Sequence, residues 1–190
     1  MELTQNPSVL ELVRKTAELT TPKEIVWIDG SEAQLESLRK IAVETGELIK
    51  LNEEKLPGCY LNRSDVNDVA RVEGRTFICS RTREEAGPTN NWMDPDEMKA
   101  KLHEILRCAM AGRTMYVIPY SMGVIGSPFA KYGIEVTDSI YVVLNMAIMT
   151  RIGTKVLDAL GDSSDVILGV HSKVTLDPEN RYIVHFPEEN

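Results

Sequence analysis

The chain has 190 residues, of which 43% are apolar, and its 21 basic and 29 acidic residues give a net charge of −8. A chain of this length and composition can bury a sizeable core, which excludes an intrinsically disordered protein. The acidic balance argues against binding to nucleic acid or to an anionic membrane surface, and no apolar run reaches the roughly 18 residues of a membrane span.

The first fifty residues predict a helix, a strand and a second helix. Asn6 followed by Pro7 is typical of a helix N-cap and first helical residue, and apolar residues then recur at helical spacing. Residues 25–28 (IVWI) predict a short buried strand. Ser31 is the expected N-cap of the second helix, and Gly46 is its expected end. This order favours an α/β layer architecture.

The rest of the chain mixes strands and helices without strict alternation. Further strands are predicted at residues 48–51, 77–80, 115–118, 134–136, 166–168 and 182–184. Helices are predicted from Asp94 to a cap at Gly112, over 155–160, and over 141–150, where the apolar composition indicates burial all round. Residues 52–68 and 81–91 are expected to be irregular. The predicted fold is a single α/β (α+β-like) domain, with a mixed sheet flanked by helices.

Cysteines and histidines show neither redox nor metal-ligand spacing. The three cysteines are interpreted as reduced packing residues of a cytoplasmic protein, and they are Cys59, Cys79 and Cys108. The three histidines are interpreted as structural or surface residues, and they are His103, His171 and His185. The patterns GxxxxGK[ST], GxGxxG, HExxH and GxSxG do not occur.

Two groups of residues are candidate anion sites. Arg71, Arg75, Arg81 and Arg83 surround the strand predicted at 77–80, and guanidinium groups hold carboxylates and phosphates in bidentate geometry. Solvated strand ends are the commoner explanation of such arginines.

The second candidate is the segment 121–128 (SMGVIGSP), which lies between two predicted strands. Its glycines could form a nest of backbone N–H groups that binds an anion. More often, two glycines and a proline between strands only make turns.

Four stretches resemble the N-terminal part of the GTP-dependent phosphoenolpyruvate carboxykinases. They are DVARVEGRTFI (68–78), NWMDPDEM (91–98), the long block 112–157 and HFPEEN (185–190). The block 112–157 is the most specific, since it contains GRTMYVIPYSMG, then GSP, GIEVTDS and IMTRIGT in that order. The resemblance covers nearly the whole chain and implies that residues 1–190 form the substrate-recognition domain of such an enzyme.

This resemblance implies an activity and two binding residues. The family is a group of carboxy-lyases of gluconeogenesis that interconvert oxaloacetate and GTP with phosphoenolpyruvate, CO₂ and GDP, using manganese or magnesium ions. Arg71, in VARVE, matches the family arginine that holds the substrate carboxylate, and Glu73 matches an acid that helps to position the substrate. If both lie on a strand, their side chains share one face.

The resemblance also implies what lies elsewhere. In the family, the metal ligands, the phosphate loop and the guanine pocket follow the HFPEEN region, so no metal ligand, cofactor ligand or catalytic residue is expected within this chain. Its expected partners are a small anionic substrate and the remainder of the enzyme, and the isolated chain is expected to be inactive. Two alternatives are a stand-alone interaction module with an exposed apolar face, and an unrelated small α/β enzyme that uses Arg71 with a distant acid.

Overall fold

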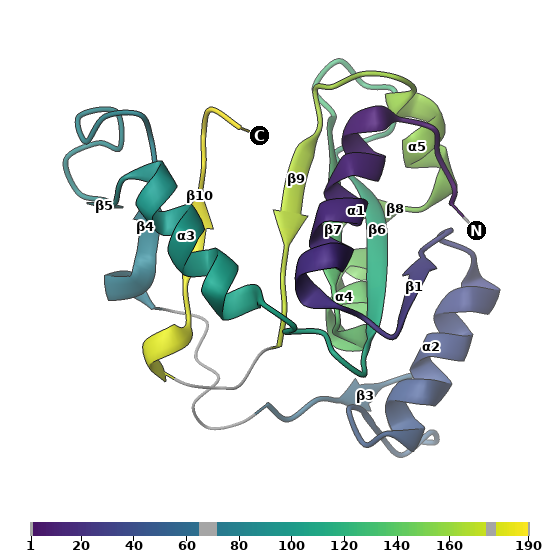
Figure 1. Cartoon of the computed structure of the whole chain (residues 1–190). Coiled ribbons are helices and arrows are strands. Elements are labelled where there is room, and N and C mark those ends of the chain that lie inside the picture. Colours follow the sequence, from purple (N-terminus) through teal and green to yellow (C-terminus); the bar gives the residue numbers. More distant parts are fainter. Residues whose placement is uncertain (1, 65–71, 174–177, 190) are drawn as a thin grey trace.

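A five-stranded mixed sheet with helices on both faces forms the larger part of the molecule (Figure 1). The computed structural model describes residues 2–64, 72–173 and 178–189. The helices are α1 (Pro7–Thr20), α2 (Glu32–Glu44), α3 (Pro95–Leu106), α4 (Ile140–Met149) and α5 (Thr154–Leu160). The strands of the main sheet are β1 (Glu24–Trp27), β6 (Thr114–Met122), β7 (Lys131–Thr137), β8 (Arg151–Ile152) and β9 (Ile167–Val170).

The pairing of these strands confirms the prediction of a mixed sheet. Their order is β1-β6-β7-β9, and β8 also pairs with β6. β1 is parallel to β6 and β9 is parallel to β7, whereas β6 is antiparallel to β7 and β8. Hairpin and crossover connections are therefore combined in one sheet, as in other α/β folds that are not doubly wound.

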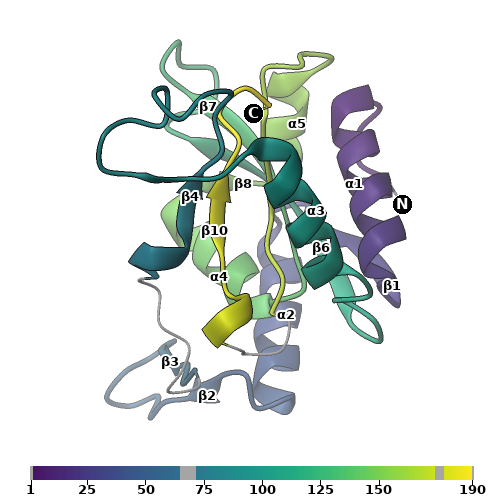
Figure 2. The ribbon, with the colours of Figure 1, turned by 60° about the vertical axis from the view of Figure 1, so that its left-hand side comes forward.

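Two smaller sheets accompany the main one. The first is entirely parallel and has the order β10-β4-β5, and the second is an antiparallel pair of β2 and β3. Their strands are β2 (Ile49–Lys50), β3 (Tyr60–Leu61), β4 (Thr76–Ile78), β5 (Asn91–Trp92) and β10 (Ile183–His185). Figure 2 shows the three-stranded sheet and α3 in front of the main sheet. β3 falls in the segment 52–68, which was expected to be irregular.

The side chains of β6 point alternately to the two faces of the sheet, and the core is divided into two clusters, one on each face. Met115 and Val117 point to one face, where they pack with residues of α1 and α5. Tyr116 and Ile118 point to the other face, where they pack with residues of α2 and α4. Because successive side chains of a strand point to opposite faces, the apolar run of β6 supplies both clusters at once.

Helix starts follow the predicted caps. The Asn6 side chain accepts hydrogen bonds from the backbone N–H groups of Ser8 and Val9, at 3.0 and 3.2 Å. Its amide nitrogen also donates to the backbone oxygens of Gly161 and Ser163, at 2.8 and 2.9 Å, so this buried residue joins the start of α1 to the end of α5.

Two helix predictions were wrong in extent. α3 ends at Leu106 and not near Gly112. The chain leaves the helix there because the Cys108 N–H donates to the Leu19 oxygen at 2.8 Å, which holds this segment against the end of α1. α4 is not buried all round, since Ile148 and Met149 are 81% and 67% exposed. Among the described residues, no helix has the length and apolar character needed to cross a membrane.

Candidate functional site

The segment that follows the predicted substrate arginine is a short turn and not a strand. Arg71 itself lies outside the residues that the structure describes. Glu73 begins a 3₁₀ helix, η1 (Glu73–Arg75), which leads into β4. The shared face that a strand would give Arg71 and Glu73 therefore does not apply to Glu73, whose exposed side chain lies on a turn that precedes β4.

Hydrogen bonds from two side chains fix the backbone of this turn. The Thr76 hydroxyl donates to the Val72 oxygen at 2.9 Å. The Asn91 side-chain nitrogen donates to the backbone oxygens of Glu73 and Thr76, at 2.7 and 3.0 Å. Asn91 belongs to β5, the strand next to β4. This strand therefore holds the backbone of the turn that carries the exposed Glu73 side chain.

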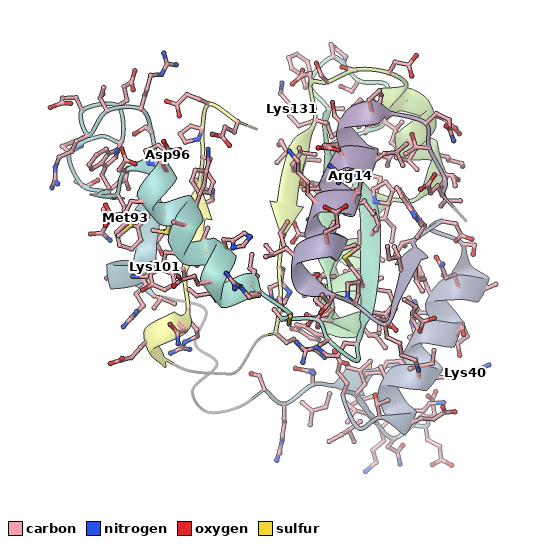
Figure 3. The ribbon with its side chains drawn as sticks, in the orientation of Figure 1. Arg14, Lys40, Met93, Asp96, Lys101 and Lys131 are labelled. Atoms are coloured by element: carbon pink, nitrogen blue, oxygen red, sulfur yellow. The ribbon has the colours of Figure 1, made fainter. Side chains whose placement is uncertain are left out.

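A tyrosine ring gathers two cations beside the same turn. The Arg75 guanidinium lies 5.5 Å from the centre of the Tyr182 ring and donates to its hydroxyl at 3.1 Å. The ammonium of Lys101, labelled on α3 in Figure 3, lies 4.9 Å from the same ring centre. The Arg75 guanidinium also donates to the Glu179 backbone oxygen. Arg75 therefore links η1 to the segment of β10, which is a structural task.

The remaining candidates from the sequence are not brought into this site. Arg81 and Arg83 are exposed in the loop beyond β4. In the segment 121–128 and just beyond it, backbone N–H groups have partners within the same turn: those of Ser127 and Ala130 donate to backbone oxygens at 3.0 Å each, and that of Gly126 donates to the Tyr132 hydroxyl at 2.9 Å. These bonds favour the interpretation as a turn over that as an anion nest.

The cysteines and histidines also remain apart. All three cysteines are free thiols, but only Cys79 is buried, so the packing interpretation is wrong for Cys59 and Cys108. Burial raises the pKa of the Cys79 thiol. His171 shares a 2.8 Å hydrogen bond with the Thr137 hydroxyl. Within the three described ranges, no group of three or more His, Cys, Asp and Glu is placed to hold a metal ion.

Asp138 is a buried carboxylate that the sequence reasoning missed. It accepts hydrogen bonds from the Arg113 Nε at 2.7 Å, from the Ser172 hydroxyl at 3.1 Å and from the Lys173 backbone N–H at 2.8 Å. It follows the end of β7, and its partners come from the start of β6 and from the segment after β9. Only the strand register brings these residues together, so the sequence carried no local signal for the site.

Glu47 performs a related task at the start of α4. Its carboxylate accepts from the Ser139 hydroxyl at 3.2 Å and from the Tyr141 backbone N–H at 3.0 Å, and it lies 3.4 Å from the Lys173 ammonium. A carboxylate at a helix N-terminus satisfies unpaired N–H groups and complements the helix dipole. Asp138 therefore anchors the segment after β9 to the sheet, and Glu47 links Lys173 of the same segment to the start of α4.

Glu135 is the one carboxyl group with a strongly perturbed pKa among the described residues, and the sequence reasoning missed it too. It lies on β7, opposite Gly169 of β9, and a Cβ atom at Gly169 would lie 2.1 Å from its Oε2 atom. Desolvation raises the pKa of this partly buried carboxyl to about 7. Burial also raises the pKa of Tyr120 on β6. Tyr120 is paired with Gly133 of β7, and its ring lies over that glycine.

A groove of about 600 Å³ lies between α2, α4 and the β2–β3 pair. Its apolar lining includes Leu48, Tyr60, Tyr141, Leu144 and Ile148. The cation in the lining, Arg39, is already paired with Glu32 at 2.6 Å and with Glu36 at 3.2 Å. A guanidinium with two carboxylates leaves little positive potential for a small anion, so this groove does not suit an acidic metabolite.

Comparison with known proteins shows the family to which this sequence belongs. Residues 11–190 match the family described as the phosphoenolpyruvate carboxykinase N-terminal domain. The chain belongs to this family. Curated relatives named phosphoenolpyruvate carboxykinase [GTP] include those of Anaeromyxobacter dehalogenans, 52% identical over 187 residues, and Neocallimastix frontalis, 49% identical over 197 residues. These alignments cover 98% and 97% of the chain.

Membership confirms the resemblance found in the sequence. A third relative of the same name, from Corynebacterium jeikeium, is 47% identical over 197 residues. The carboxykinase N-terminal domain seen here spans only about a third of these proteins, with 31% of the A. dehalogenans relative and 32% of the other two covered. The activity of the whole relatives therefore reaches this chain only as a proposal.

Proposed function

We propose that residues 1–190 are the substrate-recognising N-terminal region of a GTP-dependent phosphoenolpyruvate carboxykinase. Such an enzyme interconverts oxaloacetate and GTP with phosphoenolpyruvate, CO₂ and GDP. The observation that carries the proposal is family membership over residues 11–190, together with relatives of that name that align over nearly the whole chain. The unrelated-enzyme alternative has no comparable support.

In this proposal, Arg71 binds the substrate carboxylate. A guanidinium presents two parallel N–H donors that match the two oxygens of a carboxylate, and such charge-assisted pairs are stronger than neutral hydrogen bonds. Glu73 lies two residues further on, exposed, on a turn whose backbone Asn91 holds. We assign to Glu73 the positioning of the substrate beside Arg71, because the Asn91 side chain holds the Glu73 backbone through a hydrogen bond.

The remainder of the enzyme supplies the other parts. Manganese or magnesium ions, when bound, would provide positive charge for the developing enolate and for the transferred phosphoryl group, and GTP would supply that phosphoryl group. In this proposal, the part of this chain is to bind and orient the substrate. The isolated chain is therefore expected to fold and to show no turnover.

The test is a titration of phosphoenolpyruvate into the chain, followed by NMR. We expect resonances of residues 72–76 to shift, and the Arg71→Ala variant to lose the response. Arg83→Ala is the matched control, because Arg83 is an exposed arginine of the same region outside the turn. Equal responses of all three proteins would contradict the assignment, and GTP-dependent conversion of oxaloacetate by the pure chain would contradict its expected inactivity.

The stand-alone interaction module remains a second candidate because three large apolar side chains are strongly exposed. Phe129, Ile148 and Met149 are 89%, 81% and 67% exposed. Apolar surface of this kind promotes association when it forms a continuous patch. Light scattering over a range of concentrations tests this candidate, and a particle mass that stays monomeric throughout would exclude self-association.

A further inference from the structure

β9 and β10 are edge strands, and no described strand pairs with their outer sides. β9 is the last strand of the order β1-β6-β7-β9, and β10 is the first strand of the order β10-β4-β5. In Figure 1, β9 is the strand of the main sheet drawn next to β10, and no strand is drawn between them. Each of the two edges therefore presents backbone groups to which no described strand is paired.

The hydrogen bonds on the paired side identify these groups. The His171 N–H donates to the Val136 oxygen at 2.8 Å, so His171 directs its backbone toward β7. Backbone direction alternates along a strand, which places the N–H and C=O groups of Leu168 and Val170 on the free side. Likewise, the Cys79 N–H donates to the His185 oxygen at 2.8 Å, so the backbone of Val184 faces away from β4.

Neither edge carries the protective residues that are common on permanent edge strands. Natural edges are blunted by lysine, proline, bulges or inward-pointing charges. β9 reads ILGV and β10 reads IVH, without any lysine, proline or acidic residue. The apolar run ILGV of β9 is typical of a strand that is covered on both faces. By contrast, β1 at the opposite edge starts with Glu24, and Lys23 precedes it.

The side chains along the two edges have the same character. Ile167 and Val170 of β9 are 43% and 40% exposed, and Ile183 of β10 is 39% exposed. β-branched residues such as these are enriched in strands, where neighbouring side chains cover them. Both the backbone and the side chains of β9 and β10 are therefore suited to a covering strand.

We propose that the free edges of β9 and β10 are pairing sites for strands of the polypeptide that follows this region in a full-length carboxykinase. The inference rests on the proposed function, because it takes its partner from the longer relatives, of which this region is about a third. β-strand addition supplies main-chain hydrogen bonds, and the exposed apolar side chains supply burial. A second copy of the chain or an unrelated partner would be a different occupant.

The experiment compares amide hydrogen exchange in two proteins. One is the 190-residue chain, and the other is a full-length protein in which this chain replaces the matched region of the A. dehalogenans enzyme. We expect the amides of Leu168, Val170 and Val184 to exchange about 100-fold more slowly in the full-length protein, because paired strand amides exchange only on opening. Equal exchange in both would overturn the proposal. Slower exchange in the short chain as its concentration rises would also overturn it, because the occupant would then be a second copy.

Proline substitutions separate the two sides of β9. Val170→Pro removes an N–H on the free side only, whereas Gly169→Pro removes a hydrogen bond to β7 and also places ring atoms against the Glu135 carboxyl. We expect Val170→Pro to be tolerated by the short chain and to lower the unfolding midpoint of the full-length protein, while Gly169→Pro lowers both midpoints. Equal effects of Val170→Pro in the two proteins would contradict the proposal.

The design keeps the inference separate from the proposed function. Carboxykinase activity of the unsubstituted full-length protein tests the function, whereas amide exchange tests the edges, and protected edges in an inactive protein would uphold only the inference. If the hybrid does not fold, the same comparison is made between the A. dehalogenans enzyme and its own matched region. Unchanged exchange at the aligned amides there would overturn the proposal.

Discussion

Replacing Glu135 by glutamine is expected to stabilise the protein at neutral pH and above. The carboxyl lies over Gly169 on the sheet, and it makes no hydrogen bond or ion pair within the described part of the chain. Burial without a partner favours the neutral acid, which raises the pKa from its ordinary value of 4.5 to about 7. Tyr120 is the titratable group that faces it from β6, and Gly169 faces it from β9.

The sign and size of the effect follow from this pKa. Between pH 4.5 and about 7 the folded state binds more protons at Glu135 than the unfolded state does, so the free energy of unfolding falls as the pH rises through this range. The full difference, at about 1.4 kcal/mol for each pKa unit, sets an upper limit of about 3 kcal/mol. Below pH 4.5 the group is protonated in both states and contributes nothing to the slope.

Urea denaturation at several pH values measures the effect. Glu135→Gln should match the unsubstituted chain near pH 4 and exceed its free energy of unfolding by up to about 3 kcal/mol at pH 8. Glu54→Gln is the matched control, because Glu54 is exposed, and it should keep the pH dependence of the unsubstituted chain. The same decline of stability between pH 4.5 and 7 in Glu135→Gln and in the unsubstituted chain would refute the reasoning.

Three further substitutions test the structural residues by urea denaturation. Asn6→Ala removes a helix cap and two hydrogen bonds to the end of α5, and should lower the free energy of unfolding by about 2 kcal/mol. An unchanged free energy of unfolding would contradict the role of Asn6 in joining the two helices. Asp138→Asn leaves Arg113 without its carboxylate and should lower the free energy of unfolding by about 3 kcal/mol; an unchanged free energy of unfolding would contradict the anchoring role. Gly153→Ala places a Cβ 2.1 Å from the Asp29 oxygen at φ 103°, and should cost more than Gly46→Ala, where φ is 78° and the space is open.

Local chemistry explains which parts of the fold could be predicted. Asn6 and Asp94 cap their helices as expected because a cap depends on the next three residues only. The end of α3 at Leu106 could not be read from the sequence, because Cys108 pairs with the distant end of α1. The pairing of β3 with β2 likewise depends on a contact between two segments of two residues each, too short for a periodic signal.

The candidate site divides in the same way. Arg71 and Glu73 were predicted through a resemblance that spans the motif, and no property of the two residues alone distinguished them from the other charged residues of the sequence. The residues that surround Asp138 and Glu135 come from strands that are neighbours only in the folded sheet. Burial of a carboxylate is decided by this register, so neither residue stood out before the fold was known.

The central claim, recognition of the substrate carboxylate by Arg71, is tested most directly by the affinity of the chain for phosphoenolpyruvate. Arg71→Lys keeps the positive charge but loses the planar fork that binds two carboxylate oxygens. Isothermal titration should show a Kd for this variant at least about tenfold higher than for the unsubstituted chain, which corresponds to about 1.4 kcal/mol. Equal Kd values for the two proteins would contradict a bidentate role for Arg71, and with it the proposed function of this region.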